Sequence, residues 1–190
     1  MLFGTENIEI GILCGIRELF GCEFMDWFMK AISFVGNAGA FWIVVALVLI
    51  ASKGYRRTGI MVAIGLLLGL LIGNLMLKNL ICRPRPCWIS EDVGLLIASP
   101  KDYSFPSGHT LASFISAIVL IYENRKVGIC AMVVACVMAF SRMYLFVHFP
   151  TDIIGGIILG WIIATAVVKS VRTYERRKQS EKSEEKINQP

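Results

Sequence analysis

The sequence of Thr58–Leu77, TGIMVAIGLLLGLLIGNLML, runs for twenty residues without a charged side chain. A helix of this length extends about 30 Å, which is the thickness of the hydrocarbon core of a bilayer. The rest of the chain agrees, because 56% of its 190 residues are hydrophobic, 17% are charged and the mean hydropathy is +0.66. These values exclude a disordered chain and predict an all-α integral membrane protein.

Four further apolar stretches are similar to Thr58–Leu77 and complete a predicted bundle of five transmembrane helices. Each is apolar around its whole circumference, as expected for a helix surrounded by lipid and by other helices. Glycines four residues apart, at Gly65-Gly69-Gly73 and at Gly156-Gly160, predict close packing between these helices. The four stretches are Gly36–Ser52, Leu111–Tyr122, Val127–Phe140 and Ile153–Val168.

The first 35 residues are predicted to form amphipathic helices at the membrane surface, and they are also the candidate for a sixth span. Charged side chains between Arg17 and Asp26 interrupt any span drawn through them, and a charge at the bilayer centre costs about 2.5–3.5 kcal/mol. Between Phe20 and Ser33, aromatic residues share one helical face and charged or polar residues share another. We expect these helices to be broken near Gly36–Gly39.

The chain is predicted to form a single membrane domain over residues 1–170, followed by a charged tail over residues 171–190. The tail mixes both charge signs without apolar periodicity, so we expect it to be disordered. The net charge of +5 does not indicate a nucleic-acid partner, because most Lys and Arg residues flank apolar runs.

The distribution of basic residues predicts the orientation in the membrane. The turn Lys53–Arg57, the turn Arg125-Lys126 and the segment after Val168 hold 12 of the 19 basic residues. By the positive-inside rule these segments face the cytoplasm, so the loops Lys78–Pro106 and Ser141–Thr151 face outward. We therefore expect a multi-pass protein of the plasma membrane with a cytoplasmic tail.

Five basic residues lie on the outward side, against this rule, and both histidines of the chain, His109 and His148, lie there as well. Positive charge beside the only two groups that titrate near neutrality predicts an anion bound at the membrane surface. The five basic residues are Lys78, Arg83, Arg85, Lys101 and Arg142.

These residues fall into three segments with fixed spacing: K-x6-RP from Lys78 to Pro86, PSGH from Pro106 to His109, and SR-x5-H-x3-D from Ser141 to Asp152. The pattern resembles that of the type 2 phosphatidic acid phosphatase family, a superfamily that also includes the vanadium haloperoxidases. All eleven specified positions match in order. The resemblance implies a membrane enzyme that hydrolyses a lipid phosphate.

The His148–Asp152 spacing also makes physical sense without the family. Pro150 is favoured as the first residue of a helix, which places His148 just before that helix and Asp152 in its first turn. Asp152 can then accept a hydrogen bond from Nδ1–H of the imidazole and leave Nε2 free to attack. The resemblance implies that His148 is the nucleophile, that it forms a phosphohistidine, and that Asp152 orients it.

His109 follows a predicted helix start at Pro106-Ser107-Gly108. Ser107 is expected to cap this helix and also to touch phosphate, because backbone N–H groups at a helix start bind anions. Gly108 lets a phosphate approach closely. A protonated His109 can give its proton to the leaving oxygen, and the resemblance assigns that general-acid role to the same residue.

Lys78, Arg85 and Arg142 are the predicted cationic clamp for the phosphoryl oxygens. Arg83 is interpreted as a neighbour that attracts anions. No compact cluster of Asp and Glu suggests a metal site, so we expect no metal and no other cofactor. Cys82 and Cys87 bracket the arginines, and a disulfide between them is the less favoured alternative to two free thiols.

The leading hypothesis is a lipid phosphatase, with undecaprenyl diphosphate as the first candidate substrate because compact members of the resembled family often recycle that carrier. Phosphatidic acid and phosphatidylglycerophosphate are the alternatives. A lipid phosphotransferase fits the same motifs, and an anion transporter fits the basic cluster but leaves the His–Asp spacing unexplained. A haloperoxidase is least favoured, because vanadate would need a soluble, accessible site.

Overall fold

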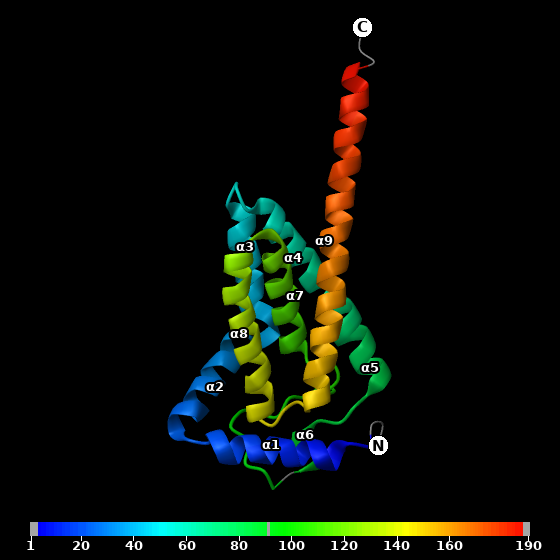
Figure 1. Ribbon diagram of the computed structural model, residues 1–190. Helices are drawn as coiled ribbons and strands as arrows, with labels where there is room; N and C mark the ends of the chain where they lie inside the picture. The colour runs from blue at the N-terminus through cyan, green and yellow to red at the C-terminus, as the bar shows by residue number, and fades with distance from the viewer. Residues whose placement is uncertain (1–3, 91, 188–190) are drawn as a thin grey trace.

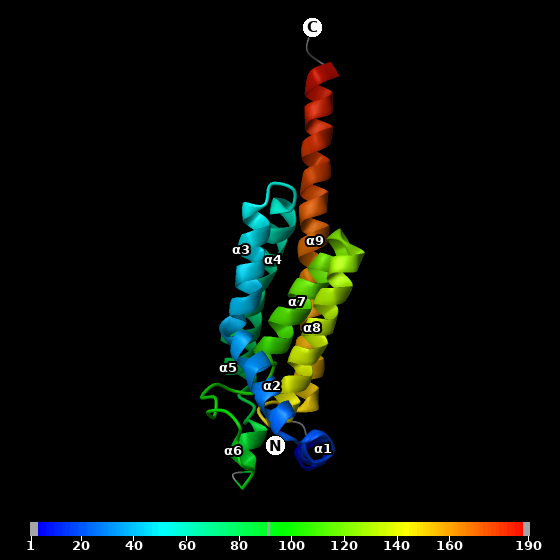
Figure 2. The same cartoon turned by 90° about the vertical axis from the view of Figure 1, so that its left-hand side faces the viewer.

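The computed structural model describes residues 4–90 and 92–187, apart from the side chains of residues 38 and 184–187. Every regular element in these ranges is helical, which confirms the all-α prediction. The longer helices stand side by side, and α1 lies across one end of the bundle (Figures 1 and 2). The elements are α1 (Glu6–Phe20), α2 (Glu23–Val35), the 3-10 turn η1 (Asn37–Gly39), α3 (Ala40–Ala51), α4 (Arg56–Gly69), the π-helix η2 (Leu70–Leu77), α5 (Lys78–Ile81), α6 (Pro86–Ile89), α7 (Gly108–Glu123), α8 (Arg125–Tyr144) and α9 (Pro150–Ile187).

Each of the five predicted apolar stretches coincides with a helix, but the helices differ in length. Three segments are long and apolar enough to cross a bilayer, namely Arg56–Ile89, Arg125–Tyr144 and Pro150–Ser183. A fourth qualifies if α2 and α3, which meet at an angle of 52°, count as one broken span. Helix α7 is apolar but shorter, with 16 residues. By these criteria the chain is a multi-pass membrane protein with three or four spans.

Helix α7 lies at the centre of the bundle and packs against α3, α4, α8 and α9. The predicted close packing at glycines is confirmed, because a methyl group on Gly65, Gly69 or Gly73 would come within 2.7 Å of Ile115 or Leu111 of α7. Trp42 also ties α3 to α7 by donating an indole hydrogen bond of 2.8 Å to Ser113.

The N-terminal helices take two different positions. Helix α1 lies across the end of the bundle, whereas α2 continues through η1 into α3, so the predicted break near Gly36–Gly39 is confirmed. The aromatic face of α2 is exposed at Phe24 and Trp27, while Ser33 on its polar face is buried. The interfacial position of residues 1–35 stays a prediction, and residues 1–3 lie outside the described part of the chain.

The C-terminal segment continues α9 as far as Ile187, beyond the other helices of the bundle. The predicted division into a domain over residues 1–170 and a disordered tail over 171–190 stays a prediction, and residues 188–190 lie outside the described part. Cys82 is exposed, Cys87 is buried, and both are free thiols.

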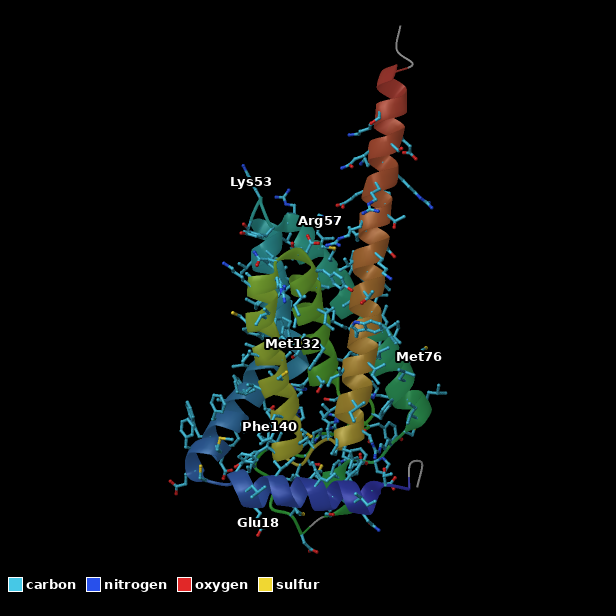
Figure 3. All side chains as sticks on the ribbon, in the orientation of Figure 1. Glu18, Lys53, Arg57, Met76, Met132 and Phe140 are labelled. Carbon is cyan, nitrogen blue, oxygen red and sulfur yellow. The ribbon has the colours of Figure 1, made fainter. Side chains whose placement is uncertain are left out.

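The two ends of the bundle carry different chemistry (Figure 3). Lys53 and Arg57 lie at the end where α9 emerges, and Glu18 lies on α1 at the opposite end. Arg57 pairs with Glu123 at 2.6 Å and with Glu175 at 2.7 Å, so it ties α4 to α7 and α9. The loop before α9, which holds His148, and the start of α7, which holds His109, lie at the α1 end.

Candidate active site

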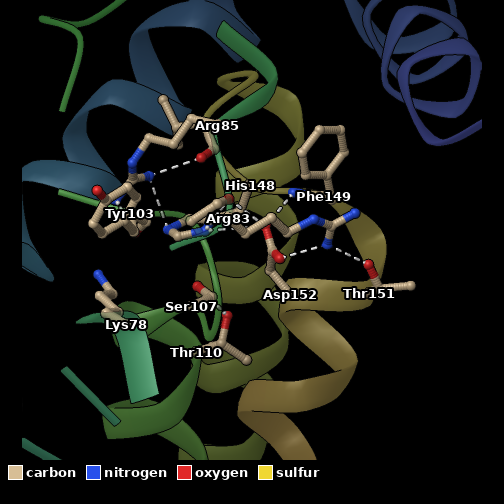
Figure 4. A network of polar contacts seen from close by, with 12 residues as sticks. Lys78, Arg83, Arg85, Tyr103, Ser107, Thr110, His148, Phe149, Thr151 and Asp152 are labelled. Atoms are coloured by element: carbon tan, nitrogen blue, oxygen red, sulfur yellow. Dashed lines mark hydrogen bonds and ion pairs between the residues drawn. The ribbon is translucent and has the colours of Figure 1, made fainter. Parts of the chain in front are cut away.

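His148 and Asp152 meet where α9 begins, as predicted from Pro150. Nδ1 of His148 lies 3.5 Å from Oδ2 of Asp152, and both side chains are buried (Figure 4). The same Oδ2 accepts a hydrogen bond of 2.8 Å from the Phe149 amide. The carboxylate is therefore held in place by the backbone of the residue just before its own helix.

Ser104 joins this pair, and the motifs did not predict it. Its hydroxyl donates to Oδ2 of Asp152 and lies 3.4 Å from Nδ1 of His148. Ser104 is fully buried, in the loop just before α7. A hydroxyl can accept and donate at once, so Ser104 can link the imidazole to the carboxylate where their direct contact is long.

Arg83 holds the other oxygen of Asp152 and does not attract anions as predicted. Its guanidinium is fully buried, donates to Oδ1 of Asp152 at 2.7 Å and also pairs with Glu9 of α1. Oε1 of Glu9 accepts in turn from the Thr151 amide at 3.0 Å. Because two carboxylates already neutralise Arg83, the anion-attracting role is wrong and a structural role replaces it.

Two of the predicted clamp residues, Lys78 and Arg85, converge on Asp102. Lys78 donates to Oδ2 of Asp102, and Nη2 of Arg85 donates to Oδ1 at 2.8 Å. Partial burial acts to raise the pKa of Asp102, but the hydrogen bond from Lys78 and the charge of Arg85 outweigh it and lower that pKa to about 2. Asp102 is a second residue that the motifs missed.

Arg85 also contacts the predicted nucleophile. Its Nη1 lies 3.1 Å from Nε2 of His148 and donates to the Val147 carbonyl at 2.7 Å. Burial, followed by the positive charges of Arg85 and Arg142, lowers the pKa of His148 well below its ordinary value. The imidazole is therefore neutral at neutral pH, as a nucleophile requires.

Arg142 and His109 complete the group of predicted side chains. Arg142, at the end of α8, is buried and donates to Ser33 of α2, which the motifs also missed. Burial, followed by the charge of Arg142, lowers the pKa of His109 to about 3. A phosphate bound between them would raise it again, because a nearby negative charge favours the imidazolium.

Ser107 and Gly108 take different places at the start of α7. Ser107 is the residue before the first turn, but its side chain makes no capping hydrogen bond and instead accepts from Thr110 at 3.0 Å. It is fully buried and is not among the residues that line the cavity. The predicted side-chain cap is therefore wrong, whereas Gly108 does line the cavity.

A cavity of about 930 Å³ brings these groups together. One part is polar and is lined by both histidines and the three clamp residues. The other part is apolar and runs between α3 and α4. The apolar lining includes Ile43, Leu47, Ile50, Leu66, Leu67 and Leu70.

The missed residues lie in two parts of the chain, the loop before α7 and the N-terminal helices. Asp102 and Ser104 lie in the loop Lys78–Pro106, where only their nearness to the PSGH segment could have singled them out. Ser33 and Glu9 lie on amphipathic helices whose polar faces were expected to face water.

Across residues 4–90 and 92–187, no group of three or more His, Cys, Asp and Glu side chains is placed to hold a metal ion.

Comparison with known proteins gives the same family that the sequence motifs resemble. The sequence model described as PAP2 superfamily matches residues 58–176. An undecaprenyl-diphosphatase of Sulfolobus acidocaldarius is 34% identical over 123 residues, which are 64% of this chain and 59% of the relative. The undecaprenyl-diphosphatase BcrC of Bacillus subtilis is 30% identical over 121 residues, 64% of this chain and 62% of the relative. The chain thus spans about three fifths of the length of these two relatives.

A solved structure shares the fold over most of its length. The crystal structure of a transmembrane PAP2-type phosphatidylglycerolphosphate phosphatase from Bacillus subtilis superposes with a TM-score of 0.75 at 25% sequence identity. The superposition covers 90% of this chain and 88% of that chain. It extends well beyond residues 58–176, so part of the likeness lies outside the matched motifs.

Proposed function

Because this chain belongs to the PAP2 superfamily, we propose that it is a phosphatase that hydrolyses a lipid phosphate or diphosphate at the membrane surface. The observation that carries this proposal is the continuity of the cavity. The same space contacts His148, His109 and the clamp at one end and only apolar side chains at the other. A polar head and an apolar tail on one molecule match that division.

The apolar part of the cavity supports a lipid rather than a soluble phosphate ester. It extends from Leu70 to Ile50, which lies near the far end of α3. Residues of α3 and α4 form both walls, so a tail can enter from the bilayer while the phosphate stays at the surface. A soluble substrate would leave this apolar surface without a partner.

The first chemical step transfers the phosphoryl group to His148. Nε2 of His148 attacks phosphorus, the bond from phosphorus to the leaving oxygen breaks, and that oxygen takes a proton from His109. Lys78, Arg85 and Arg142 neutralise the charge on the three equatorial oxygens. Asp152 keeps the imidazole oriented and stabilises its positive charge.

The second step releases inorganic phosphate. Neutral His109 takes a proton from a water molecule, which attacks the phosphohistidine as the phosphorus–nitrogen bond breaks. Nε2 of His148 returns to its starting form, and His109 holds the proton that it took from the attacking water while the phosphate is still bound. No acceptor other than water is required.

Charge in the cavity favours a diphosphate as the substrate head group. Among the described residues, four cationic side chains line it, from Lys30, Lys78, Arg85 and Arg142, against one carboxylate, that of Asp102. A phosphate monoester carries a charge of about −1.5 to −2 at neutral pH, and a second phosphate adds about one more. Three surplus positive charges therefore match a lipid diphosphate, and undecaprenyl diphosphate is the proposed substrate. Phosphatidic acid and phosphatidylglycerophosphate are the alternatives.

The proposed topology places the site outside the cytoplasm. Five helices cross the hydrocarbon core of the plasma membrane, over residues 36–52, 58–77, 111–122, 127–140 and 153–168. The end with Lys53 and Arg57 then faces the cytoplasm, and the α1 end faces outward.

An impermeant thiol reagent should label intact cells that carry a variant with Cys82 as its only cysteine, because Cys82 is exposed. Labelling only after lysis would reverse the orientation.

A phosphate-release assay on the purified protein tests the function. The panel holds a polyprenyl diphosphate, phosphatidic acid and phosphatidylglycerophosphate, without an added acceptor. We expect release with the highest kcat/KM on the diphosphate and none from the His148→Ala variant. Release that requires an added lipid acceptor would favour a phosphotransferase. Absence of release from every substrate would overturn the proposal, and anion flux into vesicles would then point to transport.

A further inference from the structure

Asn74 is a polar side chain within a predicted membrane-spanning segment. It is the one amide in Thr58–Leu77, the run of twenty residues without charge. An amide removed from water without a hydrogen-bond partner costs about 1–3 kcal/mol in proteins, and polar groups inside membrane spans are accordingly rare and functional. Its position therefore calls for a partner.

The structure places this amide beside the proposed active site. Asn74 lies in the π-helix η2, a type of turn that is frequent at functional sites. A methyl group on Gly108 would lie 2.7 Å from Oδ1 of Asn74, so the amide packs against the residue that precedes His109. Asn74 lines the same cavity as His109 and His148.

Oδ1 of Asn74 is buried without a hydrogen-bond partner among the described residues. Nε2 of His109 and Nε of Arg142 share that property, and both of these residues also line the cavity. His109 and Arg142 already have proposed roles toward the leaving oxygen and the transferred phosphoryl group. Asn74, His109 and Arg142 are thus cavity-lining residues that each carry a buried polar atom without a partner among the described residues.

The order of residues along the helix assigns the part of the substrate that meets Asn74. Lys78 lies one turn toward the surface, and Leu70 lies one turn toward the apolar part of the cavity. From the surface toward the apolar part of the cavity, the side chains along the helix are therefore a cation, an amide and an apolar group. A lipid diphosphate presents the reacting phosphate, the second phosphate and the tail in the same order.

We propose that Asn74 forms a subsite for the second phosphate of a lipid diphosphate, on the leaving side of the reaction. This inference rests on the proposed phosphatase function. A 180° turn of the Asn74 side-chain amide brings Nδ2–H to the place of the unpartnered Oδ1, where it can donate to an oxygen of the second phosphate. The turn is required because a carbonyl oxygen cannot donate to a phosphate oxygen. The contact stabilises the departing lipid monophosphate while His109 protonates the oxygen that leaves.

Two substrates with the same tail test this subsite, farnesyl diphosphate and farnesyl monophosphate. In the Asn74→Leu variant we expect kcat/KM for the diphosphate to fall about 10- to 100-fold, the effect of one hydrogen bond to a charged group. The monophosphate has no second phosphate, so its kcat/KM should change less than about 3-fold. The variant Asn74→Asp keeps the shape of the side chain and should penalise the diphosphate further through charge repulsion.

Asn79→Leu is the matched control. Asn79 follows on the same helical segment, is exposed and donates only to the Leu75 carbonyl at 2.8 Å. The Asn79→Leu variant should leave the ratio of kcat/KM for the diphosphate to kcat/KM for the monophosphate unchanged. Equal losses on both substrates in the Asn74 variants, or no loss on either, would overturn the subsite while the phosphatase function stands. A parent protein that releases phosphate from neither farnesyl substrate but from phosphatidic acid would also overturn the subsite, and one that releases phosphate from none of these three would overturn the proposed function as well.

Discussion

Nη1 of Arg85 lies 3.1 Å from Nε2 of His148. Because a guanidinium can only donate hydrogen bonds, Nε2 must be the accepting, unprotonated nitrogen of the ring. The proton then sits on Nδ1, which faces Ser104 and Asp152. One contact thus sets the tautomer that carries its lone pair on Nε2, and this lone pair can attack phosphorus once the hydrogen bond from Arg85 passes to a phosphate oxygen.

The lowered pKa of His148 predicts activity in mildly acidic solution. A nucleophile with a lowered pKa stays neutral, and therefore active, until the pH falls through that lowered value. We expect the acid limb of kcat/KM to lie well below pH 6.5, the ordinary value for histidine. A pH–rate profile measures it, with the second ionisation of the substrate phosphate, near pH 6, determined separately.

Arg85→Gln provides the internal control for that profile. Removing the adjacent positive charge should raise the pKa of His148 and move the acid limb to higher pH. An acid limb that stays in place, or a parent limb at pH 6.5, would contradict the assignment.

The two histidines should respond differently to substitution. His148→Ala removes the nucleophile and should abolish both turnover and phosphohistidine formation. His109→Ala removes the general acid, which typically contributes 10²–10⁴-fold. Its cost should be larger for phosphatidic acid, with a poor alkoxide leaving group, than for a lipid diphosphate. Comparing kcat on the two substrates tests this order, and normal turnover in both variants would sink the mechanism.

Ser104→Ala should lower kcat about 10-fold and leave KM unchanged. The hydroxyl contacts His148 and Asp152 but does not line the cavity, so its loss affects the nucleophile and not substrate binding. Steady-state kinetics separate the two constants. Ser116→Ala, at a buried serine of α7 that donates to the Ala112 carbonyl, should change neither. A rise in KM without a fall in kcat would show that Ser104 does not position His148.

Arg83→Met should destabilise the fold by about 3–5 kcal/mol, because it leaves Glu9 and Asp152 as unpaired charges in the interior. The melting temperature in detergent measures the effect. Adding Glu9→Gln should recover part of the loss, since one of the two buried charges is then removed. Arg17→Ala is the control at a partly buried arginine of α1 that pairs with no carboxylate in the described residues and donates to the Gly94 carbonyl at 2.9 Å. A double variant less stable than Arg83→Met would contradict this account.

Activity should survive an excess of EDTA, because three cationic side chains take the place that a metal ion holds in other phosphoryl-transfer sites. Vanadate, which mimics five-coordinate phosphorus, should inhibit by binding at His148. Phosphate release with and without chelator measures the first effect, with a magnesium-dependent phosphatase as a control for chelation. Complete loss in EDTA that magnesium restores would be the contrary result.

The helical membrane class, the family and the chemistry of the motifs follow from the order of amino acids alone. An uncharged run such as Thr58–Leu77 specifies a spanning helix locally, and the pairing of His148 with Asp152 follows from Pro150 and one helical turn. The family resemblance is confirmed by the match over residues 58–176. Lys78, Arg85 and Arg142 were predicted together from their charge on the unexpected side of the membrane.

The neighbours that complete the site depend on how the folded helices and loops pack. Arg83 pairs with Glu9 across 74 residues, and Ser104 meets Asp152 across 48. Neither separation corresponds to a helical or strand periodicity in the sequence, because such contacts depend on how separate helices and loops pack. The role of Arg83 was misread for that reason. Its charge is visible in the sequence, but the carboxylates that neutralise it come from α1 and α9, and only packing brings these two helices to one side chain.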